Sequence, residues 1–243
     1  MTPAPSEAAR QSRDPFWNYE DLALLIGAVL PALLLSSIAV SLGRRVVPGV
    51  LSSEANQTLA FNGLIDLLLL GALYAIVAAR YAKPFWKSLR FDHGWTRWWI
   101  YVPSGAVLAI LASTIGVALR APVIPNPVER MVAGSWSLAA VGFFAVGLAP
   151  LFEELVFRGF LYPLLAHSLG VWPGILLSAA PFALLHGQQN QWSWQHVAVI
   201  GIAGVVFGWV RYRTASTAAA ALVHSGYNLM FFAGFLLQKW LAR

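Results

Sequence analysis

The fold is decided by a stretch that reads SLAAVGFFAVGLAPLFEELVFRGFLYPLLA, residues 137–166. It is long enough to cross a bilayer, because a transmembrane helix needs about 20 apolar residues. It nevertheless carries Glu153, Glu154 and Arg158. One charged side chain at the centre of a span costs roughly 2.5 to 3.5 kcal/mol, so buried charges indicate both partners and a function. We therefore expect a membrane helix with chemistry inside the membrane plane.

The composition indicates a polytopic membrane protein with an all-α fold. Hydrophobic residues make up 58% of the 243 residues and charged residues 11%, with a mean hydropathy of +0.66, whereas soluble domains are about 25% charged. Closed membrane barrels require period-two alternation, which is missing from this sequence. A break of the last apolar run near Gly234 would give an eighth helix, so we predict a bundle of seven to eight membrane helices. The runs are 22–42, 59–81, 98–119, 137–166, 171–186, 196–212 and 216–241.

Residues 1–20 are polar and Pro-rich and lack an apolar segment behind a basic start, so we predict a disordered tail and no signal peptide. Residues 21–243 are expected to form a single transmembrane domain. The net charge of +6 comes mainly from Lys and Arg at the ends of apolar runs. That placement predicts membrane lipid as a partner and no nucleic acid. The absence of cysteine excludes disulfides and thiol nucleophiles.

Basic residues favour an N-terminus inside, in the cytoplasmic membrane, because cytoplasmic loops carry an excess of Lys and Arg. With the N-terminus inside, nine basic residues lie on the cytoplasmic side and six on the other. The nine are Arg10, Arg13, Arg80, Lys83, Lys87, Arg90, Arg97, Arg211 and Arg213, and the six are Arg44, Arg45, Arg120, Arg130, Lys239 and Arg243.

The two adjacent glutamates are predicted to have different roles. Arg158 follows Glu154 by four residues, a helical spacing that places the two charges on one face in the favourable order. Glu153 points about 100° away and has no cation in its own helix, so its carboxylate is free to act as a base. The alternative is a purely structural polar network that locks helices together.

A histidine and a polar pair occur later, each in an apolar run. His186 ends a run that begins at Val171, where a histidine alone is more often a helix cap. His224 and Asn228 are spaced to share one helical face, which suits an oxyanion hole. Their alternative is hydrogen bonding between helices, worth about 0.6 kcal/mol per bond. A carboxylate, two histidines and an asparagine together favour hydrolysis by an activated water.

Three motifs in this order, Glu-Glu-x-x-x-Arg, Phe-x-x-x-His and His-x-x-x-Asn, resemble the signature of the CPBP intramembrane proteases. This family is also called the Abi, or CAAX protease and bacteriocin-processing, family and includes the Ras-converting CAAX endopeptidase. The resemblance covers about residues 139–232, and the motif-bearing core is about 137–232. It implies an all-helical membrane endopeptidase that processes CAAX tails or leader peptides, so the expected partner is a peptide or lipidated-protein substrate.

The resemblance also implies roles for individual residues. Glu153 matches the glutamate that activates water, and His186 matches the histidine that works with it. His224 and Asn228 match the pair assigned to the oxyanion. The supporting glutamate and arginine of the family match Glu154 and Arg158.

A metal site competes with this interpretation. Glu153, His186 and His224 have the composition of a two-histidine, one-carboxylate zinc site with an open position for water. No His-Glu-x-x-His sequence supports zinc, Asn228 suits an oxyanion better than a cation, and the glutamate mechanism that the resemblance implies needs no metal. We therefore expect no cofactor, with zinc as the alternative.

Two other functions stay open from the sequence. A non-catalytic scaffold or a bacteriocin self-immunity protein could retain the same buried network, and a proton-coupled transporter could use Glu153 and the histidines as a relay. The sequence specifies neither the substrate nor the oligomeric state. Asp66 also lies inside an apolar run, where acids are functional candidates, but we interpret it as structural, bonded to Asn62 or to a neighbouring helix. A small-residue face of Gly201, Ala203, Gly204 and Gly208 predicts close helix approach.

Overall fold

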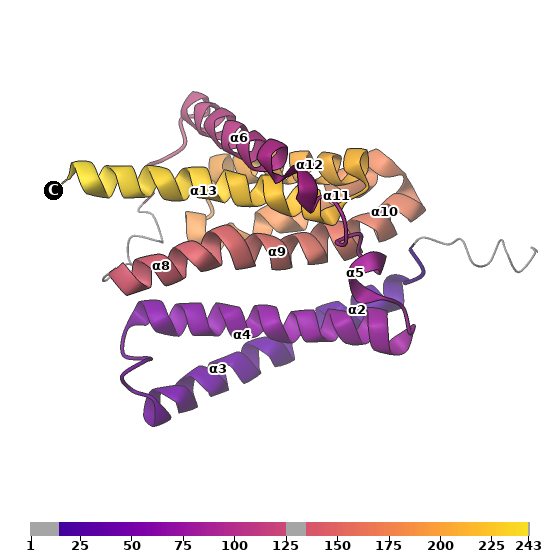
Figure 1. Ribbon diagram of the computed structural model, residues 1–243, viewed down its shortest axis with the longest axis horizontal. Coiled ribbons are helices and arrows are strands. Elements are labelled where there is room, and N and C mark those ends of the chain that lie inside the picture. The colour runs from indigo at the N-terminus through magenta and orange to yellow at the C-terminus, as the bar shows by residue number, and fades with distance from the viewer. Residues whose placement is uncertain (1–14, 125–134, 243) are drawn as a thin grey trace, which may run out of the picture.

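The computed structural model describes residues 15–124 and 135–242, and within these two ranges the chain is helical and contains no strand (Figure 1). The predicted all-α fold is therefore confirmed. Six helices are long and apolar enough to cross a membrane, and Val171–Leu185 is a shorter apolar helix. Each of the seven predicted runs corresponds to a different one of these seven helices. The six are Tyr19–Val46, Glu54–Arg80, Trp95–Ala118, Ser137–Leu169, Trp194–Thr214 and Thr217–Leu241.

The last apolar run does not break near Gly234, because α13 runs without interruption over Thr217–Leu241. The N-terminal elements are α2 (Tyr19–Gly27), α3 (Val29–Val46), α4 (Glu54–Tyr74), η1 (Ala75–Arg80), α5 (Phe85–Ser88), η2 (Trp95–Arg97) and α6 (Trp98–Ala118). The C-terminal elements are α8 (Ser135–Phe143), η3 (Phe144–Leu148), α9 (Ala149–Glu154), η4 (Leu155–Leu161), α10 (Tyr162–Leu169), α11 (Val171–Leu185), η5 (Gln188–Asn190), α12 (Trp194–Thr214) and α13.

The helix α13 is the centre of the C-terminal half. It packs against α6, α9 and α12, and α11 in turn packs against α10 and α12. On the other side of the α8–α9 helix lies α4, which forms a hairpin with α3 (Figure 1). The helix α9 is thus enclosed by an N-terminal hairpin and a C-terminal bundle, which places its glutamates inside the molecule.

The contact between α6 and α13 depends on two glycines that let the backbones touch. A Cβ at Gly105 would lie 2.6 Å from the Tyr227 amide nitrogen, and a Cβ at Gly226 would lie 2.8 Å from the Val102 carbonyl carbon. Real side chains essentially never approach so closely. Any larger residue therefore forces the two helices apart, because backbone cannot move aside as a side chain can.

We expect Gly226→Ala to destabilise the protein by about 1 to 3 kcal/mol, the usual range for overpacking. The change also shifts α13 and so displaces His224, two residues away. The measurement is thermal unfolding of the purified protein in detergent. Gly234→Ala, in the same helix with open space around the added carbon, is the control and should unfold at the wild-type temperature or above it. Equal unfolding temperatures for the two variants would contradict the prediction.

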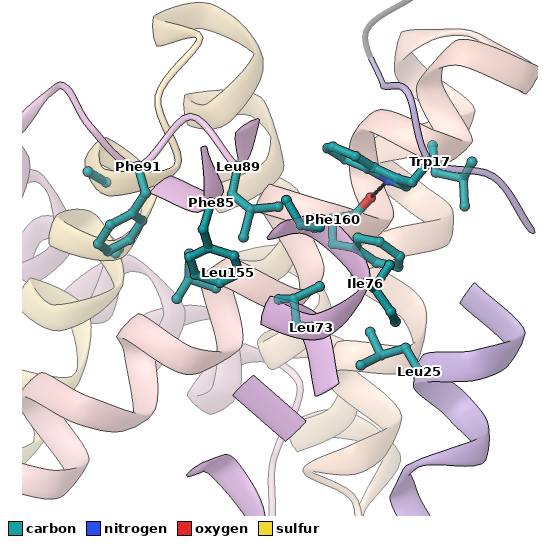
Figure 2. Packing of buried hydrophobic residues seen from close by; sticks show 13 residues of the cluster. Trp17, Leu25, Leu73, Ile76, Phe85, Leu89, Phe91, Leu155 and Phe160 are labelled. Atoms are coloured by element: carbon teal, nitrogen blue, oxygen red, sulfur yellow. Dashed lines mark hydrogen bonds between the residues drawn. The ribbon is translucent and has the colours of Figure 1, made fainter. Parts of the chain in front are cut away.

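The N-terminal segment packs against the rest of the protein from Pro15 onwards, and residues 1–14 of the predicted tail lie outside the described range. The indole of Trp17 is 3% exposed and stacks on Phe160 with the ring centroids 5.4 Å apart. Its Nε1 donates a hydrogen bond to the Phe160 carbonyl oxygen at 3.1 Å (Figure 2). Figure 2 shows Trp17 and Phe160 in one apolar cluster with Leu155, Leu73 and Ile76.

Helix α2 begins with a cluster of hydrogen-bonded polar side chains. The Asn18 side chain accepts hydrogen bonds from the backbone amides of Glu20 and Asp21, and the Asp21 carboxylate accepts one from the Asn18 backbone amide. The fully buried Asp21 also accepts a 2.6 Å hydrogen bond from the Tyr81 hydroxyl and lies 3.2 Å from an Arg80 guanidinium nitrogen. Burial, with the bond to Asp21, raises the pKa of Tyr81, so this hydroxyl stays a donor at neutral pH. The contacts of Asp21 with Tyr81 and Arg80 hold α2 against the end of the α4–η1 helix.

Candidate active site

The short helix α9, which carries Glu153 and Glu154, is bounded by two π-helical segments, η3 and η4. Each π-helical segment is followed within two residues by a proline, Pro150 or Pro163. Proline has no amide hydrogen, and its ring clashes with the carbonyl four residues earlier, so a wider turn before it relieves the clash. Such π-helical turns occur frequently at functional sites.

Glu154 is fully buried and holds two partners. Its Oε1 accepts hydrogen bonds from Arg158 Nη1 at 2.9 Å and from His224 Nδ1 at 3.0 Å. The pairing with Arg158 is the one that the spacing predicts. The pairing with His224 was not predicted, because the sequence cannot show that α13 passes beside α9.

Arg158 connects this pair to α12. Its Nη2 donates a 2.8 Å hydrogen bond to the Gly204 carbonyl oxygen, and its guanidinium lies over the Phe182 ring at 4.5 Å and near the Phe207 ring at 5.4 Å. A Cβ at Gly204 would lie only 3.2 Å from Arg158 Nη2 and from the Ala179 side chain. The predicted small-residue face is therefore confirmed at Gly204, and its carbonyl is a partner of the buried arginine.

Glu153 differs from its neighbour in its surroundings. Its side chain is 29% exposed, and its Oε2 lies 3.8 Å from His224 Nε2 and 4.0 Å from His186 Nε2. These distances exceed a direct hydrogen bond, and they suit a bridging water. The three helices α9, α11 and α13 thus bring one carboxylate oxygen and two imidazole nitrogens to one point.

The hydrogen bonds of the two histidines fix which ring nitrogen carries a proton. His186 Nδ1 lies 2.7 Å from the Phe182 carbonyl oxygen, which can only accept, so Nδ1 is the donor. His224 Nδ1 likewise donates to Glu154, whose carboxylate is paired with Arg158. In both histidines the Nε2 atom is therefore directed at Glu153. The Phe207 ring stacks on His224 at 4.5 Å and holds its plane.

Asn228 lies one helical turn beyond His224, and its amide is anchored. The Asn228 Nδ2 donates a 2.8 Å hydrogen bond to the Ala145 carbonyl oxygen in η3. The Ala149 amide bonds to the carbonyl five residues earlier, and in the same register the Ala145 carbonyl would need an amide hydrogen on residue 150, which is a proline. Pro150 thus leaves this carbonyl open for Asn228. The second amide hydrogen of Asn228 stays available as a donor.

A metal ion finds no ready site among the residues that the structure describes, since no three His, Asp or Glu side chains there are grouped as metal ligands would be. Glu153, His186 and His224 converge on one point, but the two imidazoles approach the same carboxylate oxygen, and a guanidinium lies behind them. Zinc remains the alternative that the residue types allow, and metal independence remains a prediction.

The fold and this cluster define an integral, multi-pass membrane protein with a glutamate–histidine site enclosed by its helices. Residues 135–230 match the family model described as type II CAAX prenyl endopeptidase Rce1-like. The resemblance inferred from the three motifs is therefore confirmed over this segment.

A curated relative gives a second, shorter match. The chain is 33% identical over 85 residues to UPF0177 protein YbdI of Lactococcus lactis subsp. lactis (strain IL1403). The match covers 35% of this chain and 43% of that protein, so it spans less than half the length of either. No solved structure matches the chain.

The structure brings five of the six predicted site residues into direct proximity: Glu153, Glu154, Arg158, His186 and His224. Asn228 is joined to them through its place on α13 and its bond to η3. Sequence reasoning missed three supporting features, which are the ring of Phe207, the Gly204 carbonyl and the open carbonyl of Ala145. Only the last left a signal, a proline in the middle of an apolar run.

Proposed function

We propose that the chain is an intramembrane endopeptidase that hydrolyses a peptide bond with a water activated by Glu153 and His186. The observation that carries the proposal is the convergence of His186 Nε2 and His224 Nε2 on one oxygen of Glu153, at 4.0 and 3.8 Å. A water between these atoms would be held by a base and directed at a substrate carbonyl.

The charges of the cluster support this assignment. Glu154 is neutralised by Arg158, and buried charges are stable only when paired. An ionised Glu153 is balanced if His224 carries a second proton, on Nε2, while its Nδ1–H remains hydrogen-bonded to the Glu154 carboxylate. In that state His186 is neutral, with a lone pair on Nε2. In this charge state the ionised Glu153 is a base beside the water, and His224 is a hydrogen-bond donor.

The reaction would proceed by addition of the activated water to the substrate carbonyl. Glu153 takes the proton of the water as its oxygen bonds to carbon, and it then passes this proton to the leaving nitrogen. His224 Nε2–H and the second amide hydrogen of Asn228 donate to the oxyanion that forms. Arg158 and Glu154 hold His224 in its tautomer, as second partners of catalytic histidines commonly do.

The experiment that tests the proposal compares membranes from cells that express the chain or its Glu153→Gln form. Proteomics of protein termini should find at least one new terminus that is present with the first form and absent with the second. A prenylated CAAX tail and a leader peptide are both candidate substrates, and the residues around that terminus would distinguish them. Identical termini in both membranes would refute the proposal.

The same comparison separates the other functions. A scaffold or self-immunity protein would keep its effect in cells through Glu153→Gln and His186→Ala, because neither change removes a direct hydrogen bond between helices. A transporter would show proton-coupled flux in liposomes. The family match favours the protease over both, since it is to an endopeptidase family.

Metal removal has a clear expected result. Because Glu154, Arg158 and the two Nδ1–H bonds already fix the cluster without an ion, we expect chelators to leave cleavage of a verified substrate unchanged. The measurement is a titration of activity with EDTA and with 1,10-phenanthroline. Loss of activity that zinc restores would contradict this and favour the zinc alternative at Glu153, His186 and His224.

A further inference from the structure

Asp66 is a carboxylate in the middle of a membrane span that the mechanism above does not use. It lies in α4, inside the span Glu54–Arg80, and is half-buried. The expected hydrogen bond to Asn62 is not formed, and within the described residues the Asp66 side chain has neither a hydrogen bond nor an ion pair. An unpaired acid inside a membrane span is costly, so its presence calls for a partner that arrives with function.

Asp66 is on the face of α4 that packs against the helix of the two glutamates. Three residues earlier, Gly63 faces the Phe144 ring of η3, with 3.8 Å from the position of its Cβ. Four residues later, Leu70 packs against the apolar cluster that contains Leu155 of η4. Residues spaced by three and four lie on one helical stripe, so Asp66 is on the same stripe, between these two contacts. Figure 1 shows α4 running alongside α8 and α9.

Asp66 and Glu153 also lie on helices that contact each other, α4 and α9. The other carboxylates near the site are occupied. Glu154 bonds to Arg158 and His224, and Glu153 is shared between two histidines. Among the residues that the structure describes, Asp66 is therefore the acid beside the site that has no hydrogen-bond or ion-pair partner.

Resting on the proposed function, we propose that Asp66 binds the amine that leaves when the peptide bond breaks. Hydrolysis forms one C–O bond and breaks the C–N bond. The proton that Glu153 took from water goes to nitrogen, and the proton of the new carboxylic acid follows, so the products are a carboxylate and an ammonium. A positive charge that forms inside a membrane protein needs a negative charge nearby to balance it. Asp66 supplies one by accepting hydrogen bonds from this ammonium.

The inference predicts a difference between peptide and ester substrates. An ester of the same sequence releases a neutral alcohol, so Asp66 has no charge to bind in that reaction. For Asp66→Asn, we expect kcat for the peptide to fall about tenfold, equivalent to about 1.4 kcal/mol, while kcat for the ester stays within about twofold of wild type. The probes are a synthetic peptide that spans the cleavage site found by terminal proteomics and the matching depsipeptide.

Two controls make the result decisive. Leu67→Asn places the same amide at the same depth on a lipid-exposed position, 59% accessible, and should leave both reactions unchanged. Glu153→Gln tests the proposed function separately, because it should abolish cleavage of both substrates. If Glu153→Gln is inactive and Asp66→Asn slows both substrates equally, or neither, the role of Asp66 is refuted and the protease assignment stands. If Glu153→Gln cleaves normally, the proposed function itself fails.

Discussion

Glu153→Gln is expected to lower kcat by about a thousandfold or more, within the range that positioned acid–base groups contribute. Glutamine has the same shape but cannot take a proton from water. The protein should still fold, because Glu153 Oε2 makes no direct hydrogen bond in the structure. The measurement combines cleavage kinetics of the purified protein with its unfolding temperature, which should equal or exceed that of the wild type.

The matched control is Glu54→Gln, the same change at an exposed residue in the first turn of α4. It should keep wild-type kinetics. A Glu153→Gln enzyme that retains a tenth of wild-type kcat would show that another group activates the water. Loss of activity together with loss of folding would instead assign Glu153 to the structural network.

Glu154→Gln is expected to act through stability. Removing one partner of a buried ion pair typically costs about 3 to 5 kcal/mol, because the other charge stays buried without compensation. Here Arg158 would keep neutral partners only, the glutamine amide oxygen and the Gly204 carbonyl, and His224 Nδ1 would lose its carboxylate acceptor. Activity should fall as well, since His224 is no longer held as a donor.

The double variant Glu154→Gln/Arg158→Met separates the two effects. An apolar side chain of similar length removes the stranded charge, so the free energy of unfolding in mixed micelles should recover by more than half. Activity should not recover, because His224 still lacks its carboxylate. A single Glu154→Gln variant that loses less than about 1 kcal/mol would contradict a buried, charged Glu154–Arg158 pair.

The parts of the fold that sequence predicts well are the local ones. Apolar length gave the seven helices, and the spacing of Glu154 and Arg158 gave their ion pair, because both depend on residues within one helix. The continuity of α13 through Gly234 was not predictable, because one glycine costs a helix only about 0.5 to 1 kcal/mol and does not by itself end it.

The residues of the site were predicted from the sequence, but the hydrogen bonds that join them between helices were not. The motifs identified the acid, the histidines and the asparagine, but the bond from His224 to Glu154 joins residues 70 positions apart. Such contacts depend on which helix passes beside which, as in the contacts of α13 with α6 and α9. The roles of the residues, metal use and the membrane orientation stay predictions.

The contact of Trp17 with the Phe160 carbonyl has a practical meaning for any laboratory that produces this protein. Phe160 belongs to the same π-helical segment as Arg158, so Trp17 supports the backbone behind the ion pair. A fusion or truncation that displaced residues 16–18 would loosen the helix that holds Glu153. Assays of weak or absent turnover are therefore best judged with residues 16–18 left unaltered.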